Sequence, residues 1–152
     1  MIKRLNTGDA ATAPHVASAE ADRPASPPQP SQRICLIVDD SRMIRKVARR
    51  IVESVGYAVV EAENGEEGLA RCRAAMPHLV ITDWNMPVMS GIDFVTALRA
   101  IPTERRPRVV FCTTNSGARD IHKGIEAGAD EYVIKPFDDA SLVSRLQAIG
   151  AA

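Results

Sequence analysis

Runs of consecutive apolar residues are the feature that most constrains the fold of this chain. Three such runs, near 34–38, 79–82 and 109–112, are uninterrupted rather than alternating. Uninterrupted apolar runs of this length are typical of parallel strands that are buried on both faces of a sheet. Strands are therefore predicted near 34–38, 57–61, 79–82, 109–113 and 131–134.

Helix signals occur between these strands. Candidate cap residues are Ser41, Asn64 and Ser90 at the starts of helices, and Gly56 and Gly128 at their ends. Helices are predicted near 42–55, 65–75, 91–100, 117–127 and 139–149. Strand–helix units that alternate with short connections predict an α/β fold, a doubly wound five-stranded parallel sheet with helices on both faces.

The amino-terminal segment differs in composition from the rest of the chain. Residues 1–32 are dominated by Ala, Pro, Ser and Thr. Such a segment cannot bury enough apolar surface to offset the entropy lost on ordering. The sequence therefore predicts a disordered tail over 1–32 and one folded domain over 33–150. A partner-binding tail, an inert tail and a start codon assigned too far upstream remain open alternatives.

Charge and hydropathy exclude several functional classes. Lys and Arg balance Asp and Glu at 19 each, so no net field attracts nucleic acid or an anionic membrane surface. No segment approaches the ~18 apolar residues of a membrane span. We therefore expect a cytoplasmic protein that neither binds nucleic acid nor inserts into a membrane. Cys35, Cys72 and Cys112 lack the spacing of metal ligands and are expected to be buried, reduced thiols.

Polar residues lie at the ends of four predicted strands. They are Asp39 and Asp40 after the first strand, Asp83 after the third, Thr113 at the end of the fourth and Lys135 after the fifth. In an open α/β sheet, ligands bind beyond the carboxyl ends of the strands. We therefore expect these side chains to form one site.

The acidic residues of this site point to a metal ion. Three aspartates at one place repel one another unless some are protonated or a cation joins them. Oxygen ligands suit Mg²⁺, whereas Zn²⁺ is disfavoured because no Cys or His follows these strands. With Mg²⁺ on Asp40 and Asp83, Lys135 and Thr113 would meet an incoming phosphate, and Asp83 is the best candidate for a nucleophile that forms an acyl phosphate. The histidines His15, His78 and His122 are expected on the surface.

Four motifs at this site resemble a known family. They are Val38-Asp39-Asp40-Ser41, Thr82-Asp83-Trp84-Asn85-Met86-Pro87 with Gly91, Thr113-Thr114, and Lys135-Pro136-Phe137. Through them the chain resembles the receiver domain of two-component response regulators over residues 33–150, and it looks most like single-domain chemotaxis regulators of the CheY type. The resemblance implies a flavodoxin-like sheet with strand order 2-1-3-4-5, the order known for chemotaxis receivers.

The resemblance also implies a role for each residue around the metal. Asp83 would be the phosphoacceptor, with a histidine kinase as the phosphodonor. Asp40 would ligate Mg²⁺ directly, and Asp39 would act through a bound water molecule. Asn85 would offer its backbone carbonyl to the metal.

Further residues would read the phosphorylated state. The resemblance implies that Thr113 turns toward the phosphoryl group and that Tyr132 moves from an exposed to a buried rotamer. Lys135 would pair with a phosphoryl oxygen, and its peptide bond to Pro136 would be cis. Catalysis would be limited to phosphorylation and dephosphorylation of the chain itself.

The lifetime of the phosphate is expected to depend on three residues near Asp83. Thr114 stands where many relatives carry Ala or Gly, and its β-branched side chain would narrow access to the acyl phosphate. Asn85 and Asn115 flank the same site and would position a hydrolytic water. We therefore expect a labile aspartyl phosphate whose hydrolysis Thr114 restrains.

The signal is expected to leave by docking rather than through an output domain, because only 17 residues follow Lys135. The expected docking surface comprises 117–127, 131–134 and 139–149, where phosphorylation would shift the population of two arrangements. The partner would be a flagellar switch component in chemotaxis. It would be a phosphotransferase if the chain is a phosphate shuttle or sink in a stress phosphorelay. We expect a monomer.

Two other functional classes are considered. An aspartate-nucleophile phosphatase requires a second Asp two residues after the nucleophile, but this position is Asn85, which cannot transfer protons. A receiver for a cyclic dinucleotide would use Arg-rich segments, although such segments usually form a solvated helix face and a basic loop. The basic residues concerned are Arg42, Arg45, Lys46, Arg49, Arg50, Arg105, Arg106 and Arg108.

Overall fold

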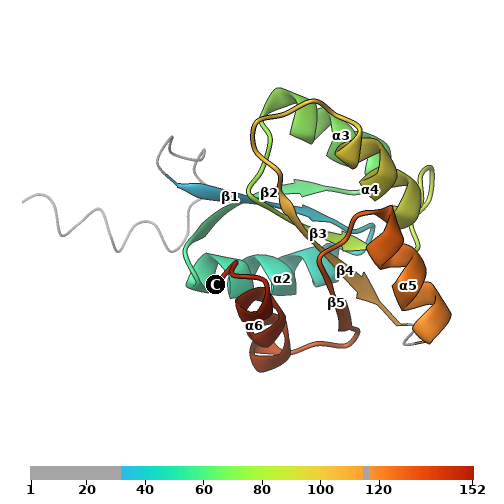
Figure 1. Ribbon diagram of the computed structural model, residues 1–152. Helices are drawn as coiled ribbons and strands as arrows, with labels where there is room; N and C mark the ends of the chain where they lie inside the picture. Colours follow the sequence, from blue (N-terminus) through green and yellow to red (C-terminus); the bar gives the residue numbers. More distant parts are fainter. Residues whose placement is uncertain (1–31, 115–116) are drawn as a thin grey trace, which may run out of the picture.

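The computed structural model describes residues 32–114 and 117–152, in which strands and helices alternate (Figure 1). The strands are β1 (Arg33–Val38), β2 (Tyr57–Ala62), β3 (Leu79–Asp83), β4 (Arg108–Thr113) and β5 (Glu131–Ile134). The helices are α2 (Arg42–Ser54), α3 (Gly65–Ala74), α4 (Gly91–Arg99), α5 (Ala118–Ala127) and α6 (Asp139–Ala148). The predicted strands and helices are confirmed to within one residue at each end. The predicted tail lies outside the described residues, apart from Gln32.

The strands form one parallel sheet in the order β2-β1-β3-β4-β5. This confirms the doubly wound α/β fold and its strand order. Strand β3 lies at the centre, and all five of its residues are buried. This position explains why its sequence is uninterrupted rather than alternating, because both faces of the strand are covered by helices.

Helices cover both faces of the sheet (Figure 1). On one face, α2 and α6 pack on the sheet through Ile51, Val52, Leu142 and Leu146 among others. On the other face, α3 and α4 pack through Leu69, Cys72, Phe94 and Leu98 among others. Alternate residues of β1 serve the two faces, with Cys35 and Ile37 on the first and Leu36 and Val38 on the second.

The helix ends follow local sequence signals. The side chains of Ser41, Asn64 and Ser90 each accept a hydrogen bond from a backbone N–H in the first turn of α2, α3 and α4. Gly56 and Gly128 follow α2 and α5 with positive φ angles of 102° and 122°, which favour glycine. Ser41, Asn64 and Ser90 thus end the loops that follow the carboxyl ends of β1, β2 and β3.

The three cysteine thiols lie in the interior of the fold. Cys35, Cys72 and Cys112 are free and buried, as predicted, and burial raises the pKa of each thiol, that of Cys72 to about 11. His78, which was expected on the surface, is half-buried. Its Nδ1 accepts a hydrogen bond from the backbone N–H of Ile34 at 3.0 Å, which ties the start of β1 to the residue before β3.

Candidate functional site

Three carboxylates meet at the carboxyl ends of β1 and β3. Asp39 and Asp40 follow β1, Asp83 ends β3, and one oxygen from each lies within 4.8 Å of the others. Asp39 and Asp83 are buried, whereas Asp40 is exposed. The structure therefore brings together the three aspartates that the sequence singled out. It places an all-oxygen set of ligands where a hard cation could bind.

Lys135 lies between two of these carboxylates. Its Nζ is 2.9 Å from Oδ2 of Asp39 and 3.1 Å from Oδ1 of Asp83. Burial lowers the pKa of Lys135, but its hydrogen bond to Asp39 and the charges of Asp39 and Asp83 outweigh burial and raise it. The ammonium is therefore held in its charged form, where it neutralises part of the acidic cluster.

The environment of Asp83 disfavours its charged form. Burial raises its pKa first, and the negative charge of Asp39 raises it further, against the opposing effects of Lys135 and of the backbone N–H of Trp84. This N–H donates to Oδ1 of Asp83 at 2.8 Å. The hydrogen bond from Trp84 therefore orients the Asp83 carboxylate. Burial and the nearby charge of Asp39 would favour the binding of a cation beside it.

Asp39 is held at each of its polar atoms. Its backbone N–H donates to the carbonyl of Ala62 at 3.1 Å. Its Oδ1 accepts from the N–H of Ser41 at 2.8 Å, and its Oδ2 binds Lys135. Its carbonyl accepts from Nη1 of Arg45 at 2.7 Å. Asp39 is thus a fixed anchor of the site.

Gly91 holds the loop that follows β3 close to the end of that strand. The N–H of Gly91 donates to the carbonyl of Trp84 at 2.9 Å. A Cβ at Gly91 would collide with the carbonyl oxygen of Asp83, so only glycine fits at the start of α4. Asn85 lies in this loop and is exposed.

Thr113 is the last residue of β4 and therefore lies at the same edge of the sheet, where the strands have their carboxyl ends. It is buried, and its carbonyl accepts a hydrogen bond from the N–H of Lys135 at 2.8 Å. This bond links the loops after β4 and β5 directly at the site. Thr114 follows and is exposed. Asn115 lies outside the described residues.

Tyr132 lies away from the acidic cluster, on β5. It is half-buried, and the guanidinium of Arg145 on α6 stacks over its ring at 4.7 Å from the ring centroid. Arg145 also pairs with Glu131 at 3.5 Å. The peptide bond between Lys135 and Pro136 is cis, as the resemblance implied.

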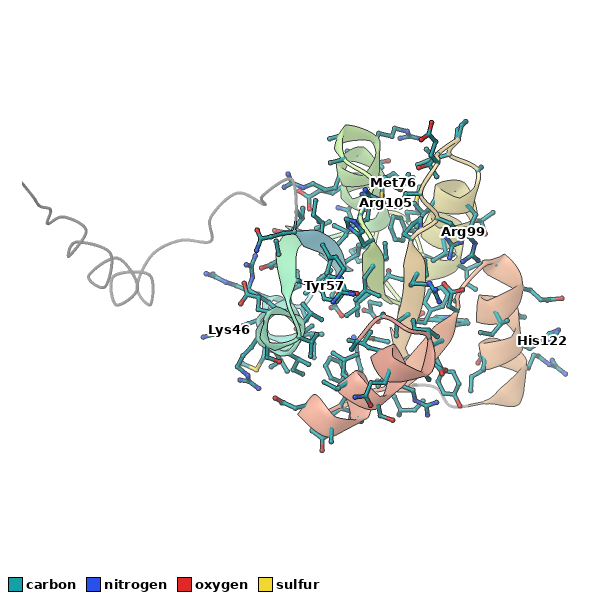
Figure 2. The ribbon with its side chains drawn as sticks, turned by 60° about the vertical axis from the view of Figure 1, so that its left-hand side comes forward. Lys46, Tyr57, Met76, Arg99, Arg105 and His122 are labelled. Atoms are coloured by element: carbon teal, nitrogen blue, oxygen red, sulfur yellow. The ribbon has the colours of Figure 1, made fainter. Side chains whose placement is uncertain are left out.

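Most of the basic residues considered for a nucleotide are engaged within the fold. On α2, the expected solvated face is wrong for Arg45, which is buried and paired with Glu61. Arg49, one turn further along α2, is half-buried and also pairs with Glu61. Before β4, Arg105 donates to the carbonyl of Met76 at 3.1 Å, and the two residues lie side by side in Figure 2. Arg106 pairs with Asp130, Arg108 donates to the carbonyl of Ile149, and Arg50 pairs with Asp139. Lys46 points away from the body of the protein (Figure 2).

Sequence reasoning missed two contributors to this site. The sequence does not distinguish Arg45 from the other cations of its helix, and Trp84 stands out only as part of a motif. A signal for Arg45 was present in Glu61, an acid at the end of a predicted strand on the same side of the sheet. No comparable signal marks the backbone N–H of Trp84.

Comparison with known proteins gives a consistent result. A family model described as the response regulator receiver domain matches residues 35–147. The chain is 34% identical to the chemotaxis protein CheY1 of Helicobacter pylori over 116 residues, which are 75% of this chain and 94% of that protein. It is also 34% identical to the phosphate regulon transcriptional regulatory protein PhoB of Escherichia coli over 117 residues, which are 77% of this chain and 51% of PhoB.

A likeness to solved structures agrees with these matches. The structure of the chemotaxis response regulator CheY4 of Vibrio cholerae has a TM-score of 0.73 with 33% sequence identity. The alignment covers 78% of this chain and 99% of that one.

Proposed function

The chain belongs to the response regulator receiver family, and on this basis we propose that Asp83 accepts a phosphoryl group from a histidine kinase. The observation that carries the proposal is the position of Lys135 between Asp39 and Asp83. The ammonium of Lys135 opposes the rise in the pKa of Asp83 that burial and Asp39 cause, and it is in position to bind an incoming phosphoryl oxygen. An oxygen of Asp83 attacks phosphorus, a P–O bond forms, and the P–N bond to the kinase histidine breaks.

The donor set of the site fits Mg²⁺. Three carboxylate oxygens within 4.8 Å of one another, with no Cys or His among them, suit a hard cation. Asp40 and Asp83 would hold the ion directly, Asp39 through water, and Asn85 through its backbone carbonyl. When bound, Mg²⁺ neutralises the charge of the acidic residues and of the phosphoryl oxygens. Lys135 and the backbone N–H of Trp84 orient the carboxylate of Asp83.

The same site does not favour a general phosphatase. Hydrolysis of many phosphomonoesters needs an acid that protonates the leaving group. Asn85, two residues after Asp83, is exposed and has no titratable proton. We therefore propose that the chemistry is limited to the phosphorylation and dephosphorylation of Asp83, whose acyl phosphate is labile. Thr114 restrains the hydrolysis, and Asn85 and Asn115 assist it.

Phosphorylation would be read through Thr113 and Tyr132. Thr113 is joined to Lys135 by a backbone hydrogen bond, which links the end of β4 directly to the loop that carries this lysine. Tyr132 lies on β5 between α5 and α6, in contact with Arg145. A change in the packing of this tyrosine would alter the surface formed by α5, β5 and α6, which we propose as the docking surface.

Chemotaxis is the favoured pathway. The curated relatives and the similar solved structures both include proteins named for chemotaxis, CheY1 and CheY4. We therefore propose docking of a monomeric, cytoplasmic receiver to a flagellar switch component. A shuttle or sink that passes phosphate to a phosphotransferase is the alternative. No helix in the described part of the chain is long and apolar enough to span a membrane.

The test is phosphorylation by a small phosphodonor with Mg²⁺, followed by intact mass. One phosphoryl group is expected on the wild type and none on Asp83→Asn. Asp93→Asn is the matched control, because Asp93 is an exposed residue on α4 outside the site. Equal labelling of the wild type and Asp83→Asn would overturn the assignment of Asp83.

A further inference from the structure

A buried arginine is hydrogen-bonded to the backbone of the acidic cluster. Arg45 on α2 is 9% exposed. Its Nη1 donates to the carbonyl of Asp39 at 2.7 Å, and its Nε donates to Oε1 of Glu61 at 2.8 Å. One planar guanidinium therefore joins the loop after β1 to the edge strand β2.

Glu61 is itself fixed from a second side. Its Oε2 accepts from Nε of Arg49 at 2.7 Å. Burial raises the pKa of Glu61, but the hydrogen bonds from Arg45 and Arg49 and their charges outweigh it and hold the pKa below its usual value. Glu61 therefore stays charged and holds Arg45 in one orientation, since a buried guanidinium requires a paired acceptor.

The carbonyl that Arg45 binds belongs to the peptide between the two adjacent aspartates. The N–H and both carboxylate oxygens of Asp39 are bonded to other partners, as described above. The carboxylate of Asp40 is exposed, and its direction depends on the plane of this peptide. A bond to the carbonyl oxygen of Asp39 controls that plane.

We propose that Arg45 is a positioning residue for the Mg²⁺ site, which acts on Asp40 through the Asp39 carbonyl and is itself held by Glu61. This inference rests on the proposed function of the site. Arg45 touches neither the metal nor the phosphate. Its role is to keep the Asp40 carboxylate aimed at the position where the carboxylates of Asp39 and Asp83 converge.

Electrostatics and positioning predict opposite results when Arg45 is removed. Loss of a positive charge near a cation site strengthens cation binding by Coulomb attraction. Loss of a group that orients a ligand weakens binding, typically 10- to 100-fold for residues that hold a metal ligand in place. The sign of the change in Mg²⁺ affinity therefore separates the two effects.

The experiment is a Mg²⁺ titration of the full chain without phosphodonor, followed by the fluorescence of Trp84. Trp84 is the single tryptophan of the chain, and its backbone N–H donates a hydrogen bond to the carboxylate of Asp83. Arg45→Met is expected to raise the Mg²⁺ dissociation constant on the order of tenfold. Arg50→Met removes the same charge from the same helix at an exposed pair with Asp139, and it is expected to leave the constant unchanged.

If Arg45→Met does not unfold cooperatively, two further variants test the positioning role. Arg45→Lys keeps the charge but cannot bond to Asp39 and Glu61 together, because an ammonium lacks the planar fork of a guanidinium. Glu61→Gln keeps the shape of the partner but removes its charge. Both are expected to weaken Mg²⁺ binding, and saturating Mg²⁺ is expected to restore the phosphorylation rate of Arg45→Lys, which a general folding defect would not allow.

The outcomes distinguish this inference from the proposed function. If the wild type binds Mg²⁺ and is phosphorylated while the Arg45 and Glu61 variants bind Mg²⁺ equally or more tightly, only the positioning role is overturned. If the wild type binds no Mg²⁺, the metal site and the inference fail together. Weaker binding in the Arg45 and Glu61 variants, with Arg50→Met unchanged, supports the positioning role.

Discussion

The ammonium of Lys135 lies 3.1 Å from the carboxylate of Asp83, so the proposed phosphoacceptor and the cation that would read the phosphate are paired before any phosphate arrives. The same ammonium lies 2.9 Å from Asp39. We therefore propose two tasks for Lys135. It first limits the repulsion among the acidic residues, and it is then in place to bind a phosphoryl oxygen.

Lys135→Met tests the first of these tasks. Without the ammonium, Asp39 and Asp83 are buried like charges with no cation between them, and the free energy of unfolding in Mg²⁺-free buffer is expected to fall by about 2 kcal/mol. Mg²⁺ is expected to restore most of this loss, because it supplies positive charge to the same carboxylates. Urea unfolding with and without Mg²⁺ measures both effects. Equal stabilisation of wild type and variant by Mg²⁺ would contradict this account.

Thr113→Val tests how the phosphorylated state is read. The substitution keeps the β-branched shape of a buried residue at the end of β4 and removes its hydroxyl. We expect Asp83 to be phosphorylated still, although more slowly. The phosphorylation-dependent change in amide hydrogen exchange over α5, β5 and α6 is expected to be lost. A full change over this surface in Thr113→Val would remove Thr113 from the switch.

Thr114→Ala tests the control of phosphate lifetime. Thr114 is exposed beside the buried Thr113, so its side chain can be shortened without disturbing the core. A smaller residue opens the approach of water to the acyl phosphate, and dephosphorylation is expected to become severalfold faster. The measurement is the decay of phosphorylated protein by intact mass after removal of the phosphodonor. An unchanged or slower decay would exclude the restraint.

The order of elements could be read from sequence because its signals are local. Uninterrupted apolar runs marked the strands, and cap residues such as Ser41 and Asn64 marked the helix starts within a few residues. The convergence of Asp39, Asp83 and Lys135 followed from one topological rule, that ligands bind beyond the carboxyl ends of parallel strands. These parts needed no knowledge of side-chain packing.

The contacts of Arg45 and His78 could not be predicted from local sequence signals. Arg45 is one of several cations on α2, and its partner Glu61 is 16 residues away on another element. Which of these arginines turns inward depends on the angle between α2 and β2, and periodicity does not give that angle. The same holds for His78, whose bond to the backbone of Ile34 spans 44 residues.

His78 predicts a dependence of stability on pH. Burial and the charges of Arg105 and Arg33 lower its pKa from an unperturbed value of 6.5. In the unfolded chain, His78 binds a proton as the pH falls below about 6.5. In the folded protein it stays neutral to a lower pH. Protonation therefore favours the unfolded chain, and stability is lost as the pH falls below about 6.5. Protonation would also remove the acceptor for the N–H of Ile34.

Denaturant unfolding between pH 7.5 and 5.5 measures this effect. His78→Gln, whose amide oxygen can accept the same hydrogen bond, is expected to reduce the dependence of stability on pH. His122→Gln is the control, because His122 points outward from α5 and pairs with Glu126 (Figure 2). A pH dependence in His78→Gln equal to that of the wild type would show that His78 does not contribute.

Gly124 allows α5 to approach Trp84, the residue that follows Asp83. A Cβ at Gly124 would lie 2.9 Å from Trp84 and 3.0 Å from Phe111, and these two rings pack on each other with centroids 4.9 Å apart. Neither ring can retreat easily from an added methyl group. Gly124→Ala gains about 1 kcal/mol of helix propensity, but overpacking of this kind costs about 1–3 kcal/mol.

We therefore expect Gly124→Ala to lower the free energy of unfolding by about 1 kcal/mol, against the usual direction for this substitution in a helix. In a Trp84→Phe background the smaller ring leaves room for the methyl group. The loss is then expected to shrink or change sign, because the gain in helix propensity remains. A double-mutant cycle by urea unfolding measures the coupling. Equal losses in both backgrounds would show that the close approach of α5 does not depend on Trp84.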